Sequence, residues 1–323
     1  MPVLPTRKKA VVEPAQRRRT NVKTVTHGRL RWLKFDHLSD PDVRYLQRNF
    51  KFHALDYEDL LSTKQRPKID EYDSYLFIIL HVPFYDRATK RLIQEEVNVF
   101  IGQDYLIAVH SGRLKVINQL FDEVRTSPKL REQYMGKGSG FLLYELISRL
   151  FEHSFPMLDQ IALRINAAEK EILAGNQKQM TEELSHLKLE IINFRRIIRP
   201  QRQLVENLEA KKMRFLPARL EMYFDDVLDA INRTNDLLEN YKEVAESLED
   251  TNETFIQHRT NNVVKVLTLI SLATLPGAAL SGLLAMNLKY PFPVNETTFF
   301  ITVAVSVALA LSLFAFMYLK RWL

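Results

Sequence analysis

The pattern of apolar and polar positions divides the 323-residue chain into three stretches that predict different structures. In the first stretch, residues 30–136, apolar runs rich in β-branched and aromatic residues are bounded by turn-forming residues. Such runs predict strands, here at 30–35, 75–82, 97–101 and 105–110. Helical spacing predicts helices at 40–49, capped by Ser39 or Asp40, and at 115–124. We therefore predict a mixed α+β domain over 30–136.

The second stretch is helical and contains a seven-residue repeat. Helical arms are expected over 137–217. Residues 218–275 then contain neither Gly nor Pro, and four apolar residues recur every seven positions: Phe224, Ile231, Leu238 and Ala245. Such a repeat predicts a coiled-coil-like seam between long helices. We expect a stalk helix over 218–262 whose repeat holds several copies of the chain together.

The third stretch carries two uncharged apolar runs, 266–286 and 299–319. Each has 21 residues, which as a helix spans about 31 Å and matches a hydrocarbon core of about 30 Å. Inside lipid, the backbone N–H and C=O groups of a segment must be bonded within it, so both runs are expected to be helices. We predict a first membrane helix over 263–287, a loop over 288–298 and a second membrane helix over 299–319.

Charge sets the expected orientation of these helices. Arg259 and Lys265 precede the first span, and the basic segment 320–323 follows the second, whereas Lys289 in the loop is balanced by Glu296. Lys and Arg gather on the cytoplasmic side of a membrane. We therefore expect both termini in the cytoplasm and the connecting loop on the outer side.

Composition narrows the class of protein further. The chain has 45 Lys and Arg residues against 39 Asp and Glu, and residues 7–34 hold ten of these basic residues against the single Glu13. We expect residues 1–29 to be a disordered tail that contacts anionic lipid or solvent rather than nucleic acid. The absence of Cys excludes disulfides and thiolate metal sites. The eight His residues form no metal or catalytic-triad pattern, and no G-x-S-x-G or phosphate loop is present. An enzyme is therefore not expected.

The first membrane span has one face of small and hydroxyl-bearing residues. On a helical wheel this face covers an arc of about 100° and comprises Asn261, Val264, Thr268, Ser271, Leu275, Ala278 and Gly282. Two membrane helices cannot enclose a conduit, so transport needs several copies around an axis, with this face as the lining of the pore. The alternative is that the face only packs helices against one another.

The segment that ends the first span resembles a known family. Ala285-Met286-Asn287 stands where the CorA family of divalent-cation channels has Gly-Met-Asn, and Val263-Val-Lys-Val-Leu-Thr268 before it is similar to the first span of that family. Further similarities lie in the arms and in the N-terminal domain, at Phe141-Leu-Leu-Tyr144, Phe155-Pro-Met-Leu-Asp159, Phe194-Arg-Arg196, Glu58-Asp59 and Gln65-Arg-Pro-Lys68. The resemblance covers residues 30–293.

The resemblance implies a CorA-like homopentameric funnel in the bacterial inner membrane, with a cytoplasmic domain, five first spans around the pore and a periplasmic loop. It assigns the selectivity filter to three consecutive residues: Ala285, Met286 and Asn287. Asn287 would supply a ring of carboxamide oxygens, which can hold hydrated Mg²⁺ through the waters that this ion gives up reluctantly. The resemblance also adds Leu267 to the pore lining and makes Val264, Leu267 and Leu275 candidate hydrophobic gates.

The resemblance further implies a regulatory metal site between neighbouring subunits. The family's Glu-Asp pair matches Glu58 and Asp59, and its Phe-x-Asp-Val-x-Asp segment places an aspartate at Asp226. A divalent ion would bridge Asp226 of one chain and Asp59 of the next, and would close the pore when cytoplasmic Mg²⁺ is high. Without the resemblance, such carboxylates are read as a solvated surface.

Three functions remain open at this point. The first is a divalent-cation channel or transporter, with Mg²⁺ as the default ion. The second is a related carrier of zinc or of another divalent cation such as Co²⁺ or Ni²⁺. The third is a weakly conducting membrane sensor or scaffold, which two departures from the family pattern suggest: Ala285 replaces the signature Gly, and a ring of Lys289 residues at the mouth would repel divalent cations.

Overall fold

The computed structural model describes residues 20–62, 65–89, 91–211, 213–286 and 295–319. The chain divides into two compact units. One comprises Met1–Ala167 and Ser185–Ala245, and the other comprises Ala168–Leu184 and Glu246–Leu323.

A six-stranded sheet forms the centre of the first unit. Its strands are β1 (Lys23–His27), β2 (Leu30–Asp36), β3 (Lys68–Glu71), β4 (Tyr75–Asp86), β5 (Arg91–Gly102) and β6 (Tyr105–His110). They lie in the order β1-β2-β6-β5-β4-β3, and all neighbours are antiparallel except β2 and β6. Because β3 is an edge strand, its outer side is available to other parts of the molecule.

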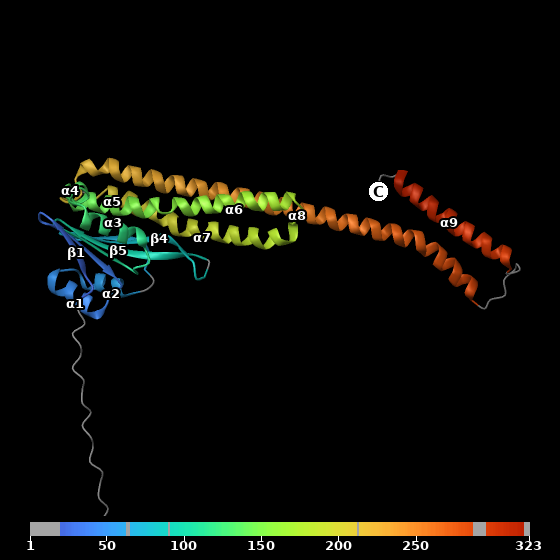
Figure 1. Ribbon diagram of the computed structural model, residues 1–323, viewed down its shortest axis with the longest axis horizontal. Coiled ribbons are helices and arrows are strands. Elements are labelled where there is room, and N and C mark those ends of the chain that lie inside the picture. Colours follow the sequence, from blue (N-terminus) through green and yellow to red (C-terminus); the bar gives the residue numbers. More distant parts are fainter. Residues whose placement is uncertain (1–19, 63–64, 90, 212, 287–294, 320–323) are drawn as a thin grey trace, which may run out of the picture. The chain divides into compact units, whose positions relative to one another are not determined.

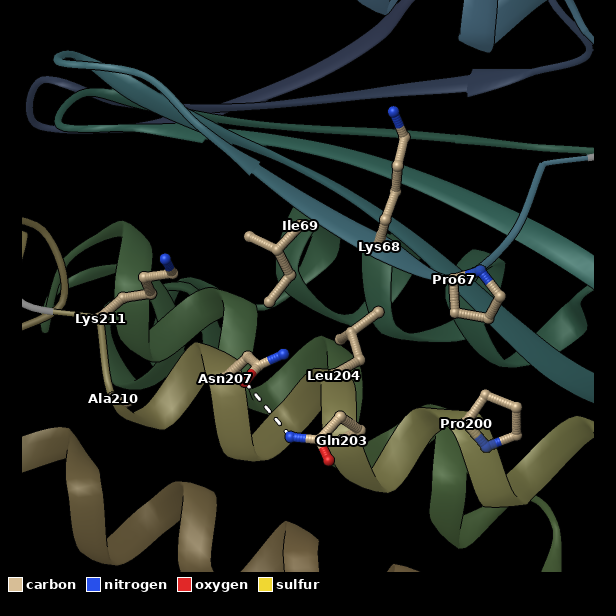
Figure 2. Close-up of a pocket in the computed structure, with 9 residues that line it drawn as sticks. All are labelled: Pro67, Lys68, Ile69, Pro200, Gln203, Leu204, Asn207, Ala210 and Lys211. Carbon is tan, nitrogen blue, oxygen red and sulfur yellow. Dashed lines mark hydrogen bonds between the residues drawn. The ribbon is translucent and has the colours of Figure 1, made fainter.

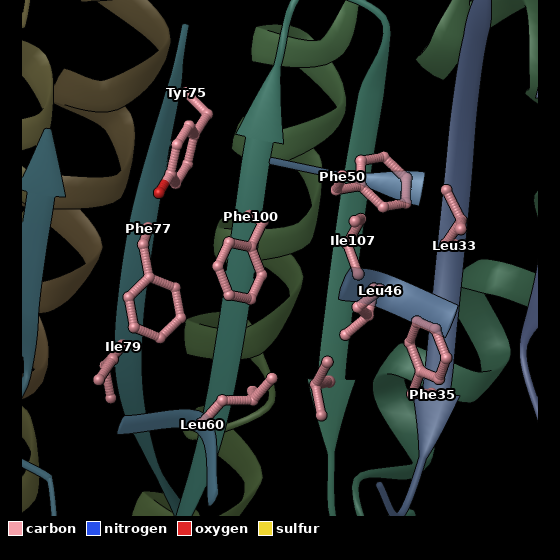
Figure 3. Close-up of a cluster of buried hydrophobic side chains, with 11 residues drawn as sticks. Leu33, Phe35, Leu46, Phe50, Leu60, Tyr75, Phe77, Ile79, Phe100 and Ile107 are labelled. Atoms are coloured by element: carbon pink, nitrogen blue, oxygen red, sulfur yellow. The ribbon is translucent and has the colours of Figure 1, made fainter. Parts of the chain in front are cut away.

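Helices cover both faces of this sheet. On one face, α1 (Asp40–Asn49) and α2 (Ala54–Leu61) lie over the strands (Figure 1). Aromatic and aliphatic side chains from alternate strand positions meet them there (Figure 3): Leu33, Phe35, Tyr75, Phe77, Ile79, Phe100, Ile107 and Val109 against Leu46, Phe50 and Leu60. Along β4, the side chains that point to either face of the sheet are buried, as expected for a strand covered on two faces.

The opposite face carries α3 (Lys115–Thr126), α4 (Pro128–Met135) and α5 (Ser139–Glu152) (Figure 1). The Ser139 hydroxyl donates to Gly102 O at 2.6 Å, which fixes the start of α5 against the end of β5. The backbone of Phe215 approaches position 140 so closely that a glycine is required there, because a Cβ atom would lie 2.2 Å from Phe215 O. The first turn of α5 is therefore packed into the unit.

Three long helices follow: α6 (Phe155–Leu173), α7 (Gln177–Glu209) and, after a short 3₁₀ turn η1 (Ala218–Leu220), α8 (Glu221–Ala285). The four residues of the seven-residue repeat are at most 2% exposed in the single chain. Phe224 meets Tyr144 of α5, and Arg195 of α7 pairs with Glu239 on α8. The expectation that this repeat joins separate copies is therefore wrong, because these apolar side chains are already buried within one protomer.

In the second unit, the end of α6 and the start of α7 pack against α8. Ala168, Ile172 and Leu184 form a small apolar cluster with Leu248 at its border. Asn252 on α8 is buried, and its Nδ2 donates to Gln177 O at 3.1 Å and to Thr181 Oγ1 at 3.0 Å. The unit ends with α9 (Glu296–Leu319).

Several predicted elements are confirmed, and some boundaries need correction. β6 and α1 match the predicted ranges, and Ser39 is the residue that caps α1. The basic tail was expected to reach residue 29, but β1 is ordered in the sheet and the Asn21 N–H donates to Asp42 at 2.8 Å. β5 begins six residues earlier than expected, and α9 begins at Glu296, inside the predicted loop.

Candidate ion pathway and regulatory site

In the part of the chain that the structure describes, two helices are long and apolar enough to cross a membrane, one within α8 and one within α9. The apolar windows of both are unburied in the single chain. A soluble protein would bury such helices, so these surfaces require either lipid or further copies of the chain as their surroundings.

The face of α8 that was predicted to line a pore is solvent-accessible along its whole length. Its described residues are all exposed in the single chain: Asn261, Val264, Leu267, Thr268, Ser271, Leu275, Ala278 and Gly282. Val264, Leu267 and Leu275 are 54%, 62% and 67% exposed, respectively. None of these eight side chains is charged. The face therefore remains free for contact with water or with neighbouring copies.

The two hydroxyl groups on this face have a defined hydrogen-bonding state. Thr268 Oγ1 donates to Val264 O at 2.8 Å, and Ser271 Oγ donates to Leu267 O at 2.9 Å. Each proton is thus directed at the helix's own backbone, and the oxygen lone pairs remain as acceptors. Acceptor oxygens of this kind can bind the hydrogens of water molecules that surround a cation.

A different face of α8 is turned toward α9. The groove between them has a volume of about 750 Å³. Small residues at four-residue spacing form the α8 wall, at Ala273, Gly277, Ser281 and Ala285, and α9 contributes Thr302, Ser306 and Ala310 among others. Ala285, which replaces the signature glycine, therefore lies on the side of α8 that faces the second membrane helix.

The outer mouth can be described only in part. Met286, the second of the three predicted filter residues, is 52% exposed just after the end of α8. Asn287 and Lys289 lie outside the described residues.

The first carboxylates of the predicted regulatory site lie on α2. Glu58 is exposed. Asp59 is less accessible, with 18% of its side chain exposed, and Lys68 Nζ on β3 lies 2.6 Å from its Oδ2. The same ammonium group lies 2.5 Å from Asp70 Oδ2. Burial alone would lower the pKa of Lys68, but its bonds to Asp59 and Asp70 outweigh burial and raise that pKa.

The third predicted regulatory residue, Asp226, is exposed on the first turns of α8. Among the described residues, no group of three or more His, Asp and Glu side chains is placed to hold a metal ion. A single protomer therefore supplies no complete site in its described part, and a metal at these carboxylates needs ligands from a second copy or from water.

A cavity of about 400 Å³ lies next to Lys68, between β3 and α7 (Figure 2). Amide, ammonium and apolar side chains line it, among them Gln203, Asn207 and Lys211, and its lining contains no carboxylate. Figure 2 shows the Lys68 side chain extending away from α7, toward the sheet. Lys211 Nζ lies 2.5 Å from Glu71 Oε2, at the far end of β3. This cavity therefore offers no anionic ligand to a cation.

Sequence reasoning missed the ion pair of Lys68 with Asp59. Lys68 and Asp70 are two residues apart, a spacing that in a β-strand places both side chains on one face. This spacing was the available signal that Lys68 pairs with carboxylates. Its partner on α2 could not be identified, because neither α2 nor β3 was predicted.

Sequence comparison identifies the family. The profile of the family described as CorA-like Mg²⁺ transporter protein matches residues 27–321. The chain belongs to the CorA family. Curated CorA relatives include the cobalt/magnesium transport protein CorA of Thermotoga maritima, 26% identical over 90% of this chain and 83% of that protein. The putative metal ion transporter YfjQ of Bacillus subtilis is also 26% identical, over 80% of this chain and 79% of its own length.

Solved structures agree with the CorA assignment at the level of the fold. The complete CorA magnesium transporter from Methanocaldococcus jannaschii superposes with a TM-score of 0.77 over 92% of both chains, at 20% identity. The full-length CmaX protein superposes with a TM-score of 0.72 over 90% of this chain and 88% of its own, also at 20% identity. The α+β domain, long helices and two apolar C-terminal helices of this chain therefore form the CorA fold.

Proposed function

We propose that this chain is the subunit of a transporter that moves divalent cations, Mg²⁺ first among them, across the inner membrane of a bacterium. Five copies surround one pore, with both termini in the cytoplasm and the α8–α9 loop in the periplasm. The observation that carries this proposal is the family match over residues 27–321, which includes both apolar helices.

The exposed face of α8 supports a pore for a hydrated ion. In the single chain this face is uncharged and carries two hydroxyl oxygens whose lone pairs remain free. A divalent ion that keeps its water shell needs acceptors for the hydrogens of that shell, not carboxylates that would hold it too tightly to release it. The apolar rings at Val264, Leu267 and Leu275 supply constrictions that close when water leaves them.

The filter and the ion are tested together by flux into liposomes. We expect the full-length protein to admit Mg²⁺, and an ion panel of Mg²⁺, Co²⁺, Ni²⁺ and Zn²⁺ to rank the cations that compete. Asn287→Ala should abolish flux and leave the oligomer assembled, whereas Asn262→Ala, outside the pore-lining set, should not. No Mg²⁺ flux in the wild-type protein would overturn the transport proposal, and normal flux in Asn287→Ala would overturn the filter.

We further propose that Asp226 of one subunit and Asp59 of the next close the pore by sharing a divalent ion, with Glu58 beside them. Asp226 is exposed and available to a neighbour. Without an ion the two carboxylates repel each other, and a bound cation removes that repulsion and favours the closed arrangement. Asp226→Asn should therefore raise the internal Mg²⁺ concentration that inhibits flux without changing ion selectivity. An unchanged inhibition curve would assign these carboxylates to the solvated surface.

A further inference from the structure

A groove between the first turns of α7 and the middle of α8 is not used by the proposed ion pathway. It has a volume of about 560 Å³ and lies entirely within the second unit. Two cationic side chains, two hydroxyls and two aliphatic side chains are among its lining residues: Lys178, Arg259, Thr181, Thr260, Ile256 and Val263. Its composition combines positive charge, hydrogen-bonding groups and apolar surface.

The walls of the groove are held together by a buried side chain. Asn252, two turns before Arg259 on α8, is 2% exposed and donates from Nδ2 to Gln177 O and to the Thr181 hydroxyl. Both acceptors belong to the first turns of α7 that form the opposite wall. Leu248, one turn before Asn252 on α8, packs against the apolar cluster that contains Ile172 and Leu184. The spacing of the two walls is therefore fixed by contacts beneath the groove.

The two cations of the groove have no anionic partner among the described residues. Across the part of the chain that the structure describes, neither Lys178 nor Arg259 has a carboxylate oxygen within 4.0 Å, and both side chains are exposed. Two positive groups that share one concave surface raise its potential and attract an anion. The planar fork of N–H donors on an arginine is well suited to bind phosphate oxygens.

The position of the groove along α8 identifies the source of the anion. Arg259 lies seven residues before the start of the apolar run at Val266, which in a helix is about 10 Å, and Val263 is about 4.5 Å from that boundary. The headgroup layer on each side of a bilayer is about 5–8 Å thick. With the cytoplasmic side of the bilayer at this end of the span, as in the proposed function, Val263 lies at the inner edge of the headgroup layer. The backbone of Arg259 lies about 2–5 Å beyond the layer, a distance that the arginine side chain spans, so its guanidinium group reaches the level of lipid phosphates.

We propose that this groove binds the headgroup of an anionic phospholipid of the cytoplasmic leaflet. Lys178 and Arg259 hold the phosphate, and Val263 contacts the first carbons of the acyl chains. The bound lipid joins α7 to α8 where α8 enters the membrane.

The test measures lipid binding and not transport, so that it is independent of flux. The full-length protein in neutral detergent is titrated with phosphatidylglycerol, phosphatidylcholine or inorganic phosphate, and bound lipid per chain is counted by native mass spectrometry. We expect preference for phosphatidylglycerol over phosphatidylcholine. Lys178→Gln with Arg259→Gln should weaken phosphatidylglycerol binding about 25-fold, given that each cation near a membrane contributes about fivefold in affinity.

A matched control removes two positive charges elsewhere. Arg87 and Lys129 are exposed and lie in the first unit, so Arg87→Gln with Lys129→Gln changes the net charge equally and should leave lipid binding unchanged. Equal loss of phosphatidylglycerol binding in both double variants would show that net charge alone causes the effect, and would overturn the proposed site. Binding that survives Lys178→Gln with Arg259→Gln, or that inorganic phosphate at millimolar concentration abolishes, would overturn the assignment to a lipid headgroup. A transporter without flux that still selects phosphatidylglycerol would leave this inference standing.

Discussion

Lys68 Nζ lies 2.6 Å from Asp59 Oδ2, so the carboxylate assigned to a regulatory ion already has a cation from its own chain. Lys68 is held there by Asp70 as well. A divalent ion that binds Asp59 must therefore compete with this ammonium group. In the proposed regulatory site, this lysine would lower the affinity of Asp59 for the divalent ion.

The first prediction concerns this competition. Lys68→Gln should lower the internal Mg²⁺ concentration that half-inhibits flux by about threefold, because a partly exposed ion pair contributes about 0.2–1 kcal/mol. The measurement is Mg²⁺ flux into liposomes at several internal Mg²⁺ concentrations. Lys211→Gln, which removes the neighbouring ion pair with Glu71, should leave the inhibition curve in place. If Lys68→Gln instead requires more Mg²⁺ for closure, Lys68 assists the regulatory site and does not compete with it.

The second prediction concerns the mouth of the pore. Ala285→Gly with Lys289→Glu should raise Mg²⁺ flux at low salt, because the glutamate reverses a ring of charge at the entrance. The gain should shrink near 1 M salt, where the Debye length is about 3 Å. The single variants separate the two effects: Ala285 lines the groove toward α9, so Ala285→Gly alone should act on the helix hairpin and show no salt dependence. Equal flux in the double variant and the wild type at low salt would show that the mouth does not limit transport.

The third prediction concerns acid sensitivity of the sheet. His110 is buried at the end of β6, with Nε2 3.1 Å from Asp36 Oδ1 and with Lys34 on the same carboxylate. Burial lowers the pKa of His110 to about 4, and Asp36 opposes this only in part. Between pH 6.5 and 4 the unfolded chain therefore binds a proton that the folded chain excludes, and stability decreases as the pH falls through that window.

We accordingly expect His110→Gln to remove a pH-dependent loss on the order of 2 kcal/mol by pH 4.5. Thermal unfolding of the full-length protein, followed by fluorescence of the buried Trp32 in the same sheet, measures this. His258→Gln at an exposed position is the control and should keep the wild-type acid profile. An unchanged acid profile in His110→Gln would assign the sensitivity to other groups.

The fourth prediction separates contacts within a protomer from contacts between copies. Leu238→Ala should destabilise the protomer by about 3 kcal/mol, because it leaves a cavity at a fully buried position, and the oligomer should remain assembled. Val244→Ala on the same helix is 39% exposed in the wild type and should change stability by less than about 0.5 kcal/mol. Thermal unfolding and native mass spectrometry give the two readouts. Loss of the oligomer without loss of protomer stability would show that the repeat lies at the subunit interface.

The sequence predicted those elements whose local pattern matches their surroundings. β6 and α1 have a regular apolar pattern and clear ends, and the apolar runs of α8 and α9 are long enough to leave no alternative. β1 and β3 were missed because an edge strand can be polar on its open side. The first half of β5 was missed because Gln94, Glu95 and Glu96 interrupt its apolar pattern, although all three pair with β4.

The candidate site was predictable where it depends on one helix and not where it depends on tertiary contacts. Seven of the eight residues predicted to face a pore follow from the helical period, Leu267 follows from the family resemblance, and all eight are exposed in the single chain. The partner of Asp59 depends on how α2 lies relative to β3. The seven-residue repeat can be buried by a helix of the same chain or by a second copy. A helix of the same chain is favoured, because its effective concentration is far higher than that of a second copy.

The burial of that repeat has a consequence for movement between subunits. Since α8 keeps its apolar stripe for its own protomer, the surface that it turns outward near Asp226 and Asp229 is acidic and hydrated. Neighbours that meet along such a surface can separate and return without exposing apolar area. In the proposed oligomer, neighbouring copies would therefore move apart and together along this surface without unfolding α8, and dissolved cations would set how closely the acidic surfaces approach.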